Sequence, residues 1–280
     1  MITKEAMDSK KKPSGGFDQF KKAIEFRKPC SVIMGDPGSG KTWFGLSAPN
    51  PFLINADDGA AEILARKGLE YSLDVVPGES STVDAEKWKE VGSTLMQLRD
   101  ADHNFKSLVV DSLDGMEKLY QASVCADKDK NSMEDFDYGK GYVFARGKLQ
   151  KFLNLLKQIR DKRDMEIIIC AHTDIKDVND PRVGTYSTHV LKLHKNSNGD
   201  VREWSDALLF LAYASKKVHD RGKFGKVDST IEQGEERYLL TQGGRGVQCK
   251  NRYSLPSELF AEDGEELYDA YWRHINATRS

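Results

Sequence analysis

Short apolar runs alternate along the chain with longer amphipathic stretches. The apolar runs predict core strands at residues 30–34, 51–54, 107–111, 166–171 and 207–212. Their Val, Ile and Leu residues are nearly continuous, which is typical of parallel strands whose two faces are both covered by helices. The alternation therefore predicts an α/β fold with a mostly parallel central sheet flanked by helices.

The amphipathic stretches predict the helices that cover this sheet. Apolar residues recur at helical spacing in residues 41–46, 83–99 and 142–162, and a terminal helix is expected at 265–274. Two long polar segments, 175–200 and 215–236, contain glycine, asparagine and many charges, and they are expected to be irregular functional loops. Residues 238–241 and 246–250 predict a late hairpin around Gly243-Gly244.

Length and composition narrow the class of protein. The 280 residues carry 42 Lys and Arg against 44 Asp and Glu, so a net charge of -2 excludes a globally basic nucleic-acid coat but permits local basic patches. No apolar run approaches the ~18 residues of a membrane span, and the N-terminus has no apolar signal region. Four scattered cysteines without a CxxC pair indicate a reducing compartment. We expect a disordered arm at 1–16 and one domain at 17–280, with its core at about 25–260.

A phosphate-binding motif follows the first predicted strand. It matches G-x-x-x-x-G-K-[ST] with Gly35, Asp36, Pro37, Gly38, Ser39, Gly40, Lys41 and Thr42. The glycines let consecutive backbone N–H groups face phosphate oxygens, and the following helix adds its positive N-terminal end. In such a loop the lysine reaches the β- and γ-phosphates and the threonine hydroxyl ligates Mg²⁺. A chance glycine-rich turn is the alternative, which the strand before the motif and the helix after it make improbable.

Carboxylates at two other strand ends fit the same chemistry. Asp111 ends an apolar strand and is expected to hold Mg²⁺ with Thr42, through water; an ordinary helix-capping Asp is the alternative reading. Asp57 and Asp58 follow the strand at 51–54, where one carboxylate would orient the hydrolytic water. Either residue could instead cap a helix, and both roles hold if Asp57 is catalytic and Asp58 caps. Asp114 is expected to face or cap the first turn of the helix after Asp111.

Several separated segments together resemble the RecA-like recombinase ATPases, most closely the compact phage-type members linked to single-strand annealing and recombination. Four stretches carry the resemblance: GDPGSGKT at 35–42, FLINAD at 52–57, LVVDS at 108–112 and GVQCKNRYSLP at 246–256. The likeness covers roughly residues 25–260. It implies a RecA-like P-loop NTPase core, with ATP and Mg²⁺ bound at subunit interfaces. The family's usual catalytic Glu is Asp57 here, one methylene shorter.

The resemblance also assigns roles to residues that are otherwise unremarkable. Lys250 and Arg252 stand where the family's basic residues reach a neighbouring subunit's γ-phosphate, although alone they would be solvated strand-end charges. His172 stands at the strand tip that carries the γ-phosphate sensor, commonly a Gln. Phe20-Lys21-Lys22-Ala23 has the form of an F-x-x-A filament hook, although an amphipathic turn is the more common meaning of such a short match.

Single-stranded DNA would contact the loop after the sensor strand. There the resemblance points to cations that neutralise phosphates and one stacking ring, namely Lys176, Arg182, Tyr186, Lys192 and Lys195. Nearby Asp residues dilute this charge, and a solvated loop is an equal alternative. A second modest basic stretch lies at 216–226, and Lys10-Lys11-Lys12 lies in the N-terminal arm.

These features lead to an ATP-hydrolysing DNA recombination or annealing protein that assembles on single-stranded DNA as a ring or filament. A nucleotide-gated scaffold or loader with marginal hydrolysis is the alternative, favoured by the short acid at Asp57 and the weak basic patches. A small-molecule P-loop kinase is a third reading, in which residues 215–236 would form a lid. The resemblance further implies a phage protein in a bacterial host cytosol, with single-strand-binding or other replication and recombination proteins as partners.

Overall fold

A mixed β-sheet forms the centre of the computed structural model, which describes residues 26–78, 80–221, 227–244 and 246–278. Its strands are β1 (Cys30–Gly35), β2 (Pro51–Asn55), β3 (Ser72–Asp74), β4 (Ser107–Asp111), β5 (Glu166–Asp180), β6 (Gly184–Leu191), β7 (Ala207–Arg221), β8 (Val227–Leu240), β9 (Lys250–Asn251) and β10 (Glu258–Phe260). The main path runs β10-β8-β7-β1-β5-β4-β2-β3, while β6 pairs with β5 and β9 with β7.

Most of the sheet is parallel. Each neighbouring pair from β3 through β2, β4, β5 and β1 to β7 is parallel. At one side of the sheet, β8 is antiparallel to β7, and β10 is antiparallel to β8. The carboxyl ends of the parallel strands therefore meet at one edge, where P-loop proteins bind phosphate. This confirms the expected α/β fold with a mostly parallel sheet flanked by helices.

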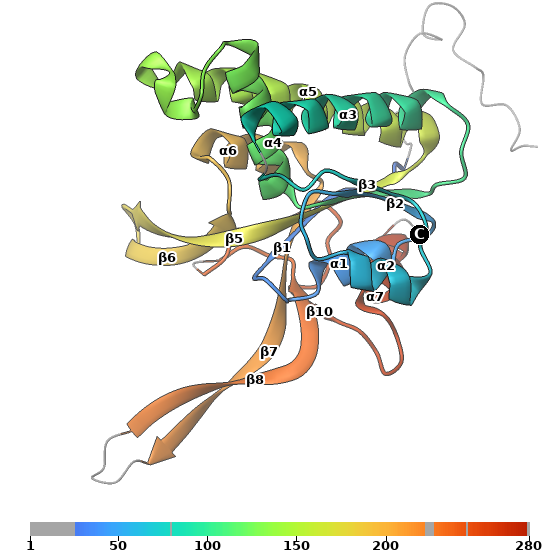
Figure 1. The fold of residues 1–280 in the computed structure, drawn as a ribbon. Helices are drawn as coiled ribbons and strands as arrows, with labels where there is room; N and C mark the ends of the chain where they lie inside the picture. The colour runs from blue at the N-terminus through green and yellow to red at the C-terminus, as the bar shows by residue number, and fades with distance from the viewer. Residues whose placement is uncertain (1–25, 79, 222–226, 245, 279–280) are drawn as a thin grey trace, which may run out of the picture.

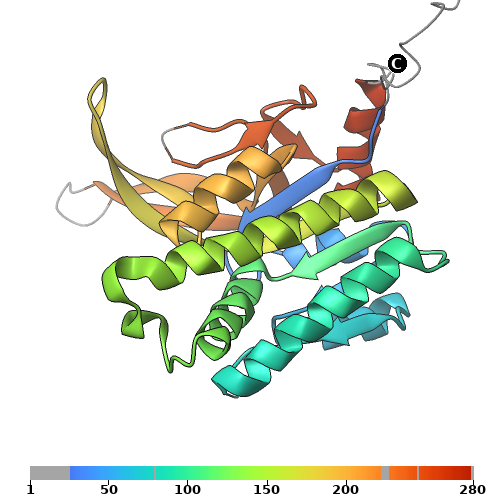
Figure 2. The same ribbon diagram turned by 90° about the horizontal axis from the view of Figure 1, so that it is seen from above.

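Helices cover both faces of the sheet (Figures 1 and 2). They are α1 (Lys41–Leu46), α2 (Ala61–Lys67), α3 (Ser81–Asp100), α4 (Leu113–Asp127), α5 (Lys140–Arg163), α6 (Lys195–Trp204) and α7 (Leu267–Ala277), with two short 3₁₀ turns at Met133–Asp135 and Asp137–Gly139. One apolar core joins α3, α4, α5 and α6 to one sheet face; the other joins α1, α2 and α7 to the opposite face. Successive β1 residues alternate between them, because Val32 and Met34 join the first core and Ile33 the second.

The strongly apolar elements lie where the sequence predicts them. The helix at Lys41–Leu46 and the strand at Ser107–Asp111 have the expected bounds. The predicted helices at 83–99, 142–162 and 265–274 are observed with ends that differ by one to three residues. Side chains that pack into a core fix these elements, so their apolar spacing is visible in the sequence.

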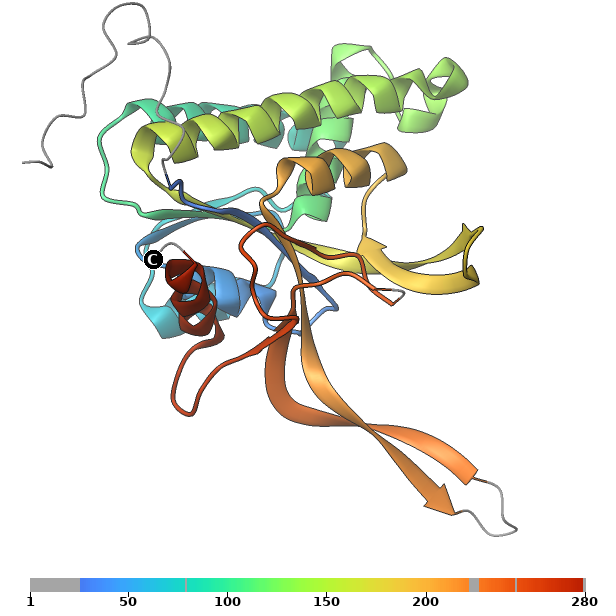
Figure 3. The same ribbon diagram turned by 180° about the vertical axis from the view of Figure 1, so that it is seen from behind.

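The prediction of irregular loops at 175–200 and 215–236 is wrong. Residues up to Asp180 continue β5 and pair with β6 as an antiparallel hairpin, and α6 follows at Lys195. Residues 215–221 and 227–236 belong to β7 and β8, which pair far beyond the body of the sheet (Figure 3). Backbone hydrogen bonds between the two strands hold such arms, and an exposed hairpin needs few apolar side chains, so its sequence resembles a polar loop.

The predicted late hairpin is also wrong. Residues 238–240 belong to β8, whose two edges are taken by β7 and β10. Gly244 does turn the chain, since its N–H donates to the Val247 carbonyl at 3.1 Å, but the returning segment then crosses to other strands. Val247 bridges to His189, and β9 pairs with the start of β7.

Three predictions fall on residues that the structure does not describe. The arm at 1–16, with Lys10-Lys11-Lys12, and the F-x-x-A segment at 20–23 lie outside the described residues. The basic stretch at 216–226 lies partly outside them, and its side chains are not described.

Candidate nucleotide-binding site

The P-loop, residues 35–42, joins the end of β1 to the start of α1 at the carboxyl edge of the sheet. Gly38 and Gly40 have φ of 80° and 103°, which favours glycine, and a Cβ on Gly35 would lie 2.5 Å from the Leu211 carbonyl oxygen. The loop borders a cleft of about 590 Å³, lined among others by Gly38, Lys41 and Thr42. A Cβ on Gly38 would have no neighbour within 4 Å, so the loop backbone is open to a ligand there.

Lys41 is buried at the base of this loop. Its ammonium donates to the carbonyl oxygens of Gly35 at 3.1 Å and Asp36 at 2.9 Å. Burial lowers the pKa of Lys41, and the nearby Cys170 and Asp111 oppose this shift. A phosphate oxygen in the loop would offer this ammonium a charged acceptor, which forms a stronger hydrogen bond than a carbonyl does.

Thr42 and Asp111 are in contact, as their predicted shared role requires. The Thr42 hydroxyl donates to Asp111 Oδ2 at 2.5 Å. Asp111 is the last residue of β4 and is 3% exposed; burial raises its pKa, and the bond from Thr42 opposes that rise. A hydroxyl and a carboxylate beside a phosphate cleft are hard oxygen donors of the kind that Mg²⁺ prefers, so Thr42 and Asp111 would hold the ion there. The donor set therefore fits the ion.

Two carboxylates, from Asp57 and Asp114, lie on either side of the His172 ring. Asp114 binds His172 twice, accepting from the backbone N–H at 3.1 Å and lying 3.0 Å from ring Nδ1 through Oδ2. Burial raises the pKa of Asp114, but the His172 bonds outweigh it and bring that pKa down to about 2. The other ring nitrogen, Nε2, lies 3.6 Å from Asp57 Oδ2. The ring is thus held between two carboxylates, with Nε2 and Asp57 at the cleft.

Asp57 and Asp58 differ in their position relative to the cleft. Asp57 lines the cleft, whereas Asp58 is exposed and its backbone N–H donates to Asp57 Oδ1 at 2.9 Å. Asp58 does not cap α2, since the N-cap residue is Ala60 and no side chain caps that helix, so this prediction is wrong. Asp114 lies in the first turn of α4 as expected, and Ser112 is the capping residue. The contact between Asp114 and His172 had no signal in the sequence because 58 residues separate them.

The DNA-contact residues predicted after the sensor strand lie on or beside the β5–β6 hairpin. Lys176 and Tyr186 share one face, because Lys176 pairs with Thr188 and Val178 with Tyr186. Arg182 lies in the turn and pairs with Asp180 at 3.0 Å, Lys192 follows β6, and Lys195 begins α6. Tyr186 is half-buried, and the four cations are exposed. The hairpin is tied to the P-loop at its base, where Thr173 Oγ1 donates to Asp36 Oδ1 at 2.6 Å.

Lys250 and Arg252 lie at the opposite edge of the sheet. Asn251 pairs with Ala207, which pairs with Ser31 near the start of β1, so neither basic residue reaches the P-loop of its own chain. The Lys250 ammonium donates to the carbonyl oxygens of Arg202, Glu203 and Ser205 and thereby closes the C-terminal end of α6. Arg252 pairs with Asp206 at 2.9 Å, remains 54% exposed, and borders a cavity of about 550 Å³ together with three further cations, Arg27, Lys157 and Arg160.

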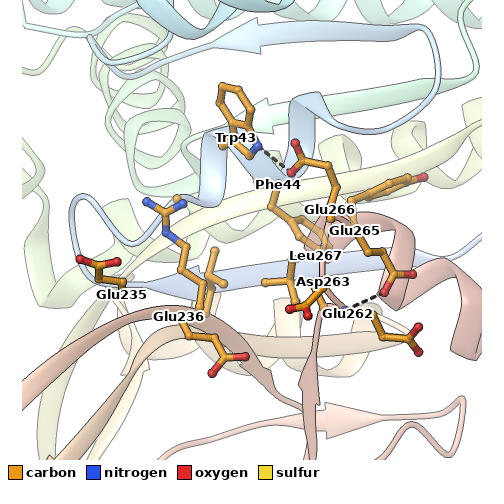
Figure 4. A pocket seen from close by; sticks show the side chains of 15 residues that line it. Trp43, Phe44, Glu235, Glu236, Glu262, Asp263, Glu265, Glu266 and Leu267 are labelled. Carbon is orange, nitrogen blue, oxygen red and sulfur yellow. Dashed lines mark hydrogen bonds between the residues drawn. The ribbon is translucent and has the colours of Figure 1, made fainter.

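Sequence reasoning missed a second cavity on the other side of the P-loop. This cavity of about 340 Å³ shares Gly40, Trp43 and Arg237 with the phosphate cleft. Its wall carries six carboxylates, from Glu235, Glu236, Glu262, Asp263, Glu265 and Glu266 (Figure 4). The Trp43 indole N–H donates to Glu266 Oε2 at 2.8 Å. These acids lie in two segments that only the fold brings together, so no local motif marks them.

Comparison with known proteins agrees with this geometry. A family model described as an AAA domain matches residues 27–253, which include the P-loop, the acid-bearing strand ends and both hairpins. No curated protein was found to match the sequence. Among the helices of the described residues, none combines the length and apolar character needed to cross a bilayer.

Proposed function

The chain belongs to the AAA-domain family of P-loop ATPases, and on that premise we propose that it hydrolyses ATP with Mg²⁺ to act on single-stranded DNA in recombination or annealing. The observation that carries the ATPase part is the contact of Thr42 with Asp111 at 2.5 Å beside a buried Lys41. These are the lysine, hydroxyl and carboxylate that hold a nucleoside triphosphate and its ion in P-loop enzymes. The DNA part is supported by the resemblance and by the exposed cations of the β5–β6 hairpin.

Each cleft residue has a distinct task in this proposal. Lys41 and the P-loop N–H groups hold the β- and γ-phosphates, while Thr42 and Asp111 would hold the metal. Bound Mg²⁺ supplies positive charge that offsets the charge developing on the phosphates. Asp57 accepts a proton from the attacking water or orients it, and His172 Nε2 donates to the γ-phosphate while Asp114 fixes the ring.

Assembly into a ring or filament forms the second part of the proposal. The P-loop and Arg252 occupy opposite edges of the sheet, so a head-to-tail contact would bring Arg252 of one subunit to the nucleotide of the next. Four cations and one carboxylate, Asp206, line the cavity around Arg252, so this face keeps a net positive charge although Asp206 pairs with Arg252 and Arg160. Because the Lys250 ammonium is occupied by three carbonyls, Arg252 is the better choice for the trans-acting residue.

A nucleotide-gated scaffold or loader is the second candidate function. It is favoured by the short side chain of Asp57, which replaces the longer Glu usual in the family and lies 3.6 Å from His172 Nε2. In such a protein ATP binding would change the shape of the molecule, and hydrolysis would be slow.

Steady-state ATP turnover with and without a single-stranded oligonucleotide tests the proposal. We expect Mg²⁺-dependent turnover that the oligonucleotide raises, its loss in Lys41→Ala, and a fall of about 10²–10⁴-fold in Asp57→Asn. Asp58→Asn is the matched control, since Asp58 is adjacent, exposed and outside the cleft lining. Unchanged DNA action in Asp57→Asn would favour the scaffold instead. Absence of both turnover and DNA retention in the wild type would contradict the proposal.

A further inference from the structure

Arg237 stands at the base of the β7–β8 hairpin, where it is held by an aromatic partner. It pairs in register with Tyr213, and its Nη2 donates to the Tyr213 hydroxyl at 2.6 Å. The guanidinium also lies 4.9 Å from the centre of the Tyr213 ring. These two contacts hold the Arg237 side chain in one orientation, although the residue is exposed.

This pair lies directly against the P-loop. The Tyr213 hydroxyl donates to the Gly38 carbonyl at 3.4 Å, and a Cβ on Gly40 would lie 3.1 Å from Arg237 Nε. Arg237 and Gly40 together border both the phosphate cleft and the acidic cavity. Arg237 therefore lies at the boundary between the phosphate cleft and the acidic cavity.

The charge of Arg237 is not neutralised within the described part of the chain. Its hydrogen-bond partner there is a neutral phenol, and no described carboxylate lies within ion-pair distance of it. The other arginine at the cleft, Arg66, differs because it pairs with Glu62 at 2.9 Å. A preorganised guanidinium that has no carboxylate partner and faces a phosphate cleft is suited to bind a phosphate oxygen.

The position also indicates which part of the nucleotide Arg237 meets. Asp111 ends β4, Asp57 follows β2, and His172 lies in β5 opposite Gly35, so all three come from strands on one side of β1. Arg237 comes from the opposite side through β7 and β8. The first group surrounds the phosphate that hydrolysis removes. Arg237 faces the other phosphates of the nucleotide. The carboxylates of Glu235 and Glu236, which line the second cavity, would repel phosphate from that cavity.

We propose that Arg237 is a phosphate-binding residue acting within its own subunit, which contacts the phosphates common to ATP and ADP. The inference rests on the proposed nucleotide site and adds to it a cation that neither the P-loop motif nor the trans-acting Arg252 supplies. It assigns the phosphates to the cleft side of Arg237 and leaves the acidic cavity to the uncharged part of the ligand. Tyr213 is a positioning residue that holds the guanidinium in place.

Calorimetric titration of the full chain with Mg²⁺ and a non-hydrolysable ATP analogue, and separately with Mg·ADP, tests this assignment. Removal of a charged hydrogen bond in Arg237→Ala should weaken both affinities by about tenfold or more. Arg237→Lys should recover part of the loss, because it keeps the charge without the fork. Tyr213→Phe should give a smaller loss of affinity, since it removes the hydrogen bond to the guanidinium but leaves Arg237 in place.

Arg99→Ala is the control, because Arg99 is a partly exposed arginine at the outer end of α3 that pairs with Asp100 away from the cleft. Thermal unfolding of each variant verifies that it folds. If Arg237→Ala does not fold, the affinities of Tyr213→Phe and Arg237→Lys still test the inference. Wild-type affinities in Arg237→Ala would overturn the inference, and so would a loss confined to ATP. If the wild type binds neither nucleotide, the proposed function itself fails.

Discussion

Two hairpins extend from the strands on either side of β1, and they differ in how each is tied to the P-loop. The first arm, residues 173–191, continues β5 beyond His172, and Thr173 binds the Asp36 side chain at 2.6 Å. The second arm, residues 213–221 and 227–237, continues β7 and β8, and Tyr213 binds the Gly38 backbone at 3.4 Å. Both therefore begin at the phosphate-binding loop, but with different chemistry.

The residues at the bases of the two arms suit different tasks, ATP turnover at the first and nucleotide binding at the second. At the base of the first arm, the His172 ring lies between two carboxylates, and such a group can transfer a proton and bind a terminal phosphate. The base of the second carries an arginine and a phenol, which suit a static anion contact. We infer that the first arm responds to hydrolysis of the γ-phosphate and the second to the presence of any nucleotide.

The largest expected contrast comes from deleting the two side chains separately. His172→Ala should lower ATP turnover by about 100-fold with little change in ATP affinity, because a donor to the developing charge is lost. Arg237→Ala should do the reverse and mainly weaken affinity. Turnover and calorimetric affinity measured on the same preparations check this. His172→Gln should restore part of the turnover, and equal effects of both variants on both quantities would contradict the division.

A stability effect should follow from the contact that holds His172. The pKa of Asp114 is about 2 when folded, below its ordinary value near 4, so the ionised carboxylate stabilises the fold by about 2 kcal/mol at pH 7. A lowered pKa means that this stabilisation is complete above about pH 4 and is lost as the pH falls toward 2. Urea unfolding of Asp114→Asn should thus show a large loss at pH 7 and a smaller one at pH 3. An equal loss at both values would remove the electrostatic explanation.

The smallest expected effect concerns DNA and the first arm. Removing two phosphate contacts in Lys176→Ala/Lys192→Ala should weaken oligonucleotide binding by about tenfold at low salt and reduce the salt slope by about 1.4. Fluorescence anisotropy at several salt concentrations measures both quantities. Lys89→Ala/Lys118→Ala, on α3 and α4, is the matched pair of exposed lysines. A wild-type slope in the arm variant would exclude the first arm as the DNA contact.

The sequence was informative wherever burial or a strict motif constrained it. Val32, Val109 and Ile168 are fully buried, so their strands appear as apolar runs, and the P-loop needs glycine at fixed positions. The Thr42–Asp111 contact was predictable for the same reason, since Asp111 ends such a strand and Thr42 closes the motif that follows another. Strand ends in a parallel sheet share one edge, so the two side chains were expected to meet.

The arms were not predictable because strand pairing, and not burial, defines them. Exposed residues such as Lys176 and Asp177 alternate with few apolar neighbours, so the strand period is hidden. Arg237 was missed since its meaning depends on Tyr213, 24 residues away, and on Gly40, which the fold alone brings near. Lys250 and Arg252 look equivalent in the sequence, yet the end of α6 holds the first and leaves the second exposed.

Amide hydrogen exchange with and without Mg²⁺ and a non-hydrolysable ATP analogue tests most directly that nucleotide is bound between the bases of the two arms. We expect slower exchange in the P-loop and at both bases, at residues 172–174 and at 211–213 with 237–239. Protection limited to the P-loop, or extended to only one arm, would contradict it.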